Sequence, residues 1–187
     1  MRIAASLALA CCLAAPALAI TQDAPKPAVG TPQPPEQVYG KLLSMMEKQF
    51  VDAAEAMPED KFDFAPPASA GEFKGVRSFS GQLKHVIEAN SYFFHDPAKP
   101  MVDNRADIEK LKTRAEIIAA LKQSFADAHS YIDTITPENA YLTMGSGGTR
   151  AGMASFGIAH LMDHYGQLVV YLRMNGIIPP ASRGGSM

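Results

Sequence analysis

The chain has 187 residues, of which 47% are hydrophobic and 19% are charged, and its formal net charge at pH 7 is -2. This length and composition are typical of one globular domain with a sizeable core. The slightly acidic balance gives no support for DNA or RNA binding, which normally requires a basic face. We therefore expect no nucleic-acid partner.

Residues 1–19 have the pattern of a secretory signal peptide. A charged start with Arg2 precedes an apolar run over residues 4–15, and Ala17 and Ala19 form a small-residue cleavage site. The apolar run is shorter than the roughly 20 residues that a bilayer core requires. We predict cleavage after Ala19 and an exported protein, periplasmic or secreted, with no stable membrane span.

Both cysteines, Cys11 and Cys12, lie within this predicted signal peptide. They raise the alternative of a lipoprotein anchor, which is less favoured because Ala8, Leu9 and Ala10 are a poor lead-in for lipidation. A mature chain without thiols suits an oxidising compartment. It also has no disulfide, no cysteine nucleophile and no thiolate metal ligand.

The remaining chain is predicted to be a short tether, one helical domain and a tail. Residues 20–35 are rich in proline and alanine and indicate an extended tether, whereas 181–187 indicate a flexible tail. Within the domain, 36–180, apolar residues recur at helical spacing in four segments, with no alternating strand pattern. We therefore expect an all-α fold, an antiparallel four-helix bundle.

Capping residues mark the ends of these predicted helices. The first runs from Glu36 to Met57, and the second, about 78–94, has Ser78 as its N-cap. A polar connection then leads to the third, which begins at a capping box of Thr113 and Glu116. The fourth is expected from about Thr149 to Asn175, with Gly176 as its C-cap. In the stretch after the first helix, Phe62 and Phe64 are expected to plug one end of the core.

Three of the five histidines occupy predicted mid-helix positions: His85, His160 and His164. His160 and His164 are four residues apart, which places both imidazoles on one helix face. Together with a histidine from a facing helix they would hold a transition metal and leave a coordination position open. The alternative is an ordinary pair of core or surface histidines. Leu161 excludes the common zinc-protease motif, in which glutamate follows the first histidine.

Three stretches resemble the DinB-like superfamily: residues 160–180 its C-terminal signature, 57–66 the loop after its first helix, and 77–85 its second-helix motif. The resemblance implies a four-helix bundle that binds a divalent transition metal, often nickel or zinc, through His85, His160 and His164. It also implies a possible homodimer.

Other polar residues have weaker predicted roles. Gln167 is expected to make an interhelical hydrogen bond rather than orient a ligand, and Arg173 to form a salt bridge near a helix end. Glu88 either accepts a proton near the metal or faces solvent. We expect His95 to cap a helix end, and His129 is a competitor for a fourth ligand. Methionines 153, 162 and 174 are predicted to fill the core rather than bind copper.

The leading hypothesis is a metal-dependent hydrolase or transferase acting on a small molecule, because a bound metal activates a water or a thiol at neutral pH. The alternative is a non-catalytic metal-binding or protein-interaction module. A pocket that opens onto the three imidazoles would favour the enzyme, whereas a closed site with four protein ligands would favour the module.

Overall fold

The computed structural model describes residues 26–145 and 147–184. The predicted signal peptide, part of the tether and the end of the tail lie outside the described residues. Residues 26–32 form a separate exposed segment, and the compact unit begins at Gln33. No described helix is both long and apolar enough to cross a membrane.

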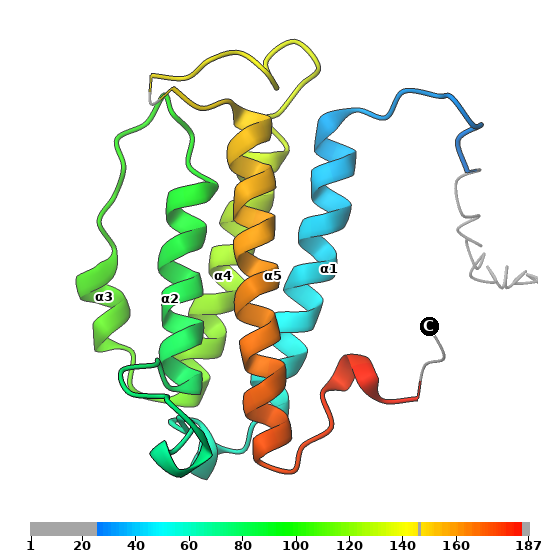
Figure 1. Ribbon diagram of the computed structural model, residues 1–187. Coiled ribbons are helices and arrows are strands. Elements are labelled where there is room, and N and C mark those ends of the chain that lie inside the picture. The colour runs from blue at the N-terminus through cyan, green and yellow to red at the C-terminus, as the bar shows by residue number, and fades with distance from the viewer. Residues whose placement is uncertain (1–25, 146, 185–187) are drawn as a thin grey trace, which may run out of the picture. The chain divides into compact units, whose positions relative to one another are not determined.

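The described residues contain five α-helices and no β-strand (Figure 1). The helices are α1 (Pro35–Ala56), α2 (Phe79–Phe93), α3 (Arg105–Lys110), α4 (Arg114–Ile132) and α5 (Arg150–Met174). Three short 3-10 helices accompany them, at Glu59–Lys61, Ala68–Ala70 and Pro180–Ser182. The prediction of an all-helical fold is confirmed.

The predicted N-caps of α2 and α4 are present. The Ser78 hydroxyl accepts a hydrogen bond from the Gly81 N–H at 3.2 Å, at the start of α2. Thr113 and Glu116 form both hydrogen bonds of the capping box before α4. Gly176 follows the end of α5 with a φ of 74°, the left-handed conformation that lets a chain leave a helix.

The connection between α2 and α4 contains α3, which the sequence did not predict. α3 has only six residues, and Ile108 is its one buried side chain. Its apolar pattern is therefore too short to recognise, and its packing against α2 holds it in place. Across this connection the chain returns to the end of the fold at which α2 begins (Figure 1).

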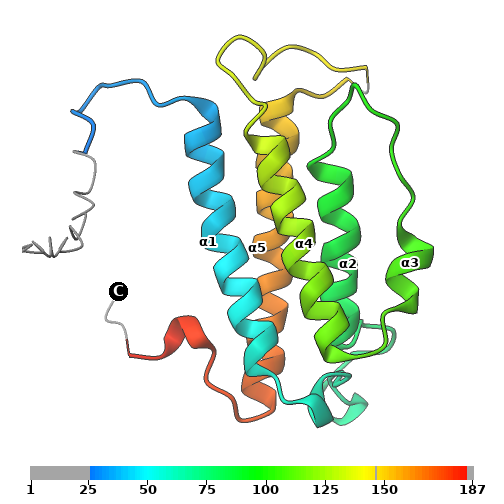
Figure 2. The same cartoon turned by 180° about the vertical axis from the view of Figure 1, so that it is seen from behind.

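The four longer helices pack side by side, with α1 and α2 each contacting both α4 and α5 (Figures 1 and 2). α1 and α5 run in one direction and α2 and α4 in the other, so α2 and α5 are antiparallel neighbours while α2 and α4 are parallel neighbours. The packed helices are therefore partly parallel and partly antiparallel. The reason is that the long connection between α2 and α4 returns the chain to the end at which α2 begins before α4 starts.

Aromatic side chains fill the space between these helices. Phe50 of α1 is fully buried and its ring centroid lies 6.0 Å from those of Phe125 and Tyr165. Phe62 packs against Phe79 at one end of the core, and Phe64 against Tyr171, which confirms the predicted plug.

The predicted packing role of the methionines holds only in part. Met153 packs against the core. Met162 and Met174 are 46% and 39% exposed, so the prediction that they fill the core is wrong. Apolar residues lie on all sides of α5, and helical spacing alone therefore did not identify its buried face.

Candidate metal centre

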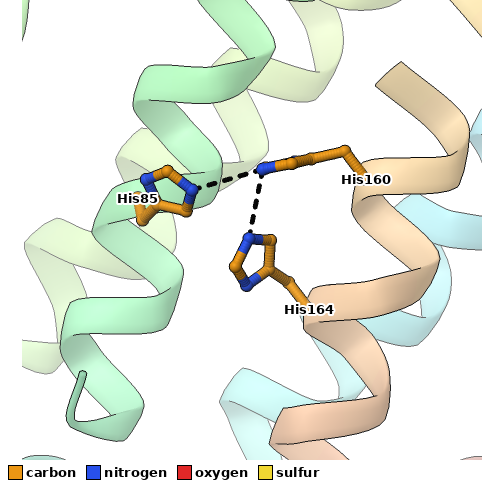
Figure 3. Close-up of side chains that lie close together, drawn as sticks. All are labelled: His85, His160 and His164. Atoms are coloured by element: carbon orange, nitrogen blue, oxygen red, sulfur yellow. Dashed lines mark hydrogen bonds between the residues drawn. The ribbon is translucent and has the colours of Figure 1, made fainter. Parts of the chain in front are cut away.

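The antiparallel packing of α2 against α5 brings the three predicted histidines together. His160 and His164 lie one turn apart on α5, and His85 faces them from α2 (Figure 3). Gly157, one turn before His160, allows the close approach. A Cβ atom at Gly157 would lie 2.8 Å from the Cβ of Phe93 and 2.7 Å from the Cζ of Phe94 at the end of α2.

The imidazole Nε2 atoms converge on one point. His160 Nε2 lies 3.2 Å from His85 Nε2 and 3.1 Å from His164 Nε2 (Figure 3). The potential ligand atoms of the three residues all lie within 4.8 Å of one another, so the group could hold a metal ion. Among the described residues, no other group of three or more histidine and carboxylate side chains meets the same criterion.

A buried glutamine orients His164. Oε1 of Gln82 lies 2.8 Å from His164 Nδ1 and accepts a hydrogen bond from its N–H, which leaves the lone pair on Nε2 facing the cluster. The Gln82 amide in turn donates to Gln167 Oε1 at 2.6 Å, and Gln167 donates to Asp163 Oδ2 at 3.2 Å. The predicted interhelical hydrogen bond of Gln167 is confirmed. Gln82 was missed, although it lies three residues before His85 on the same helix face.

The Nδ1 atoms of His85 and His160 differ in their surroundings. His85 Nδ1 lies 4.0 Å from a carboxylate oxygen of Glu88, whose side chain is 43% exposed. Glu88 therefore both borders the cluster and reaches solvent. Within the described part of the chain, His160 Nδ1 is buried and has no hydrogen-bond partner.

The surroundings keep the three imidazoles neutral. Burial lowers the pKa of His164 to about 4, with His160 and His85 adding to the shift. Burial, followed by the charge of Arg77, also lowers the pKa of His85. Burial lowers the pKa of His160, and Arg77 acts in the same direction. Neutral imidazoles have the free lone pairs that metal coordination needs.

We expect the metal-free protein to lose stability as the pH falls from 7.5 to 5.0. In this range the His164 imidazole becomes protonated in the unfolded chain, where its pKa has the ordinary value of 6.5. In the folded chain it stays neutral, because its pKa there is about 4. The loss should be roughly 2 kcal/mol in the free energy of unfolding, measured by urea titration. His164→Gln should reduce this difference, and equal stability of the wild type at both pH values would contradict the expectation.

Replacing Gln82 should weaken metal binding without abolishing it. Gln82→Met keeps the side-chain volume but removes the acceptor that orients His164, so we expect the affinity for zinc to fall about 10- to 100-fold. Competition with a chromophoric chelator measures this change. Gln123→Met is the matched control, because Gln123 hydrogen-bonds Asp127 on the surface of α4. An affinity within twofold of wild type would show that Gln82 does not support the site.

The other predicted polar residues lie outside the cluster. His129 interacts with Glu47 at 3.0 Å and does not join the three histidines as a fourth ligand. His95 pairs with the carbonyl of Lys99 in the turn after α2 and does not cap the helix itself. Arg173 donates to the Ser182 hydroxyl at 3.3 Å, and within residues 26–145 and 147–184 it forms no salt bridge.

The fold and the cluster define an all-helical protein with a three-histidine candidate metal site between two helices. The family model of the DinB superfamily matches residues 42–168, which include all three histidines, and the chain belongs to this superfamily. The resemblance in the sequence is thereby confirmed. No curated protein matches the chain at a significant level.

Proposed function

We propose that the chain binds one divalent transition metal ion, zinc or nickel, through His85, His160 and His164. The carrying observation is the convergence of three imidazoles on one point, each presenting Nε2. In this proposal α1, α2, α4 and α5 serve as a four-helix bundle that holds the ligands on rigid elements.

The spacing of the nitrogens fits such an ion. Zinc–nitrogen bonds of about 2.0–2.1 Å at tetrahedral angles separate two nitrogens by about 3.3 Å. The observed separations of 3.2 and 3.1 Å are close to this value. The oriented Nδ1 of His164 is a further feature of metal-ligating imidazoles.

We further propose that the centre is catalytic, as a hydrolase or transferase for a small molecule. A metal with an open position acts as a Lewis acid that favours deprotonation of a water molecule or a thiol. Two features of the site support this proposal over a non-catalytic metal-binding or interaction module. Only three protein ligands converge among the described residues, and His85 lines a surface cavity of about 310 Å³.

An exogenous thiol tests whether the centre has an open position. Protein loaded with cobalt(II) should change its visible absorption spectrum when 2-mercaptoethanol is added, and the change should saturate with thiol concentration. A spectrum that does not respond would indicate a closed site, and the interaction module would then be the better interpretation.

Export and homodimer formation are also proposed. Support for export comes from the sequence of residues 1–19 alone. Expression of the full chain in a bacterium with a secretory system should give periplasmic protein whose N-terminus, determined by sequencing, is Ile20. A cytoplasmic product that retains Met1 would contradict export. The homodimer is tested separately by light scattering, which measures the molar mass at several protein concentrations.

A further inference from the structure

A cavity between α2 and α3 has the candidate metal centre at one side. One wall consists of Arg77, which precedes α2, and of Gly81, Lys84, His85 and Glu88 on α2 itself. The facing wall comes from α3, which packs against α2. A molecule in this cavity therefore lies directly against a ligand of the proposed metal.

Two cations of this cavity make no direct contact with an anion of the described chain, although Lys84 acts electrostatically on Glu116 at the start of α4. Among the described residues, the side chains of Arg77 and Lys84 make no hydrogen bond or ion pair. Arg105 on the facing wall differs, because its guanidinium lies 2.6 Å from a carboxylate oxygen of Asp103. The charge of Arg77 lies just before the N-terminus of α2, where the helix dipole adds to it, and that of Lys84 lies in the second turn.

The acidic residues of the cavity lie elsewhere along its walls. Glu88 is one turn beyond Lys84 on α2, next to His85, and Glu109 is on α3. A ligand with one anionic end is therefore directed by charge, with that end toward Arg77 and its other end toward His85.

The backbone keeps the beginning of this wall open and fixed. Gly81 lies between Arg77 and Lys84 in the sequence, and a Cβ atom there would come within 3.4 Å of the Arg77 Cβ and 3.2 Å of the Ser78 hydroxyl. The Tyr171 hydroxyl of α5 donates to the Arg77 carbonyl at 2.9 Å. Arg77 is thereby anchored at its backbone while its guanidinium remains available.

We propose that this cavity binds a small acidic molecule whose carboxylate or phosphate group pairs with Arg77 and Lys84 and whose other end faces His85. Arginine suits this role because its planar guanidinium makes paired hydrogen bonds with such oxyanions. That the molecule is also the substrate of the metal centre rests on the proposed function. Binding of the anion at Arg77 and Lys84 does not depend on the proposed function.

Titration of the metal-free and zinc-loaded full chain with butyrate and with inorganic phosphate tests the proposal. At low ionic strength, NMR signals of α2 and α3 residues should shift and saturate as anion is added. The anion with the lower dissociation constant indicates whether a carboxylate or a phosphate is preferred. Arg77→Gln should raise the dissociation constant about tenfold or more, because a charge-assisted hydrogen bond is lost. Lys84→Gln should weaken binding in the same direction.

Lys122→Gln is the matched control, since Lys122 lies on α4 outside the cavity and pairs with Glu55. Absence of saturable binding of both anions, or equal binding by wild type and Arg77→Gln, would overturn the anion site even if zinc binds normally. Conversely, if the chain cannot be loaded with zinc but still binds an anion in a manner that depends on Arg77, the anion site stands and the proposed function is refuted. Circular dichroism of each variant verifies that it is folded.

Discussion

Removing the imidazole of His164 should reduce the affinity for zinc by about 100-fold or more. Binding free energies of roughly 10–16 kcal/mol for four-ligand zinc sites correspond to about 3 kcal/mol per ligand. His164 also has the most strongly fixed position of the three, through its hydrogen bond to Gln82. His164→Ala, measured by chelator competition at pH 7.5, should therefore bind zinc far more weakly than wild type.

His85→Ala and His160→Ala should show losses of similar size, because each removes one Nε2 atom from the same cluster. His129→Ala is the matched control, since His129 pairs with Glu47 outside the cluster. It should bind zinc as wild type does. If the alanine variants of the cluster keep the wild-type dissociation constant, the ligands have been assigned incorrectly.

Gly157→Ala should be strongly destabilising, although alanine is a better helix former than glycine. The added Cβ would lie 2.7 and 2.8 Å from atoms of Phe94 and Phe93, and both phenylalanines are buried. Relieving such an overlap in a packed interior costs about 1–3 kcal/mol in the free energy of unfolding. Urea titration measures this loss, and the midpoint should move to lower urea concentration.

Gly166→Ala on the same helix is the control for the effect of alanine itself. Gly166 is exposed, and no atom lies within 4 Å of a Cβ placed there. This variant should be stabilised by about 0.5–1 kcal/mol through helix propensity. The two substitutions are thus expected to have opposite signs. Stabilisation by Gly157→Ala would show that α2 and α5 do not approach each other as closely as described.

Local chemistry made much of the fold predictable from the sequence. The capping residues Ser78 and Thr113 and the terminating Gly176 act within a few residues of their position, so their patterns are visible without tertiary information. α3 was missed because its stability depends on packing Ile108 against another helix. The exposed Met162 was misplaced because α5 is apolar on more than one side.

The candidate site was predictable to a similar extent. The four-residue spacing of His160 and His164 and the resemblance of residues 77–85 identified all three histidines that the structure brings together. The link from Gln82 to Gln167 depends on the register of α2 against α5, which the sequence does not encode locally. The cavity beside His85 likewise requires α3, so the place of Arg77 in its wall could not be recognised from the sequence.

Elemental analysis of the wild-type chain, purified without a chelating resin, tests the central claim most directly. The triple variant H85A/H160A/H164A, prepared identically, provides the background. We predict about one zinc or nickel ion per wild-type chain, before or after reconstitution, and none above background in the variant. A wild-type chain that holds no stoichiometric transition metal even after reconstitution would contradict the proposed metal centre.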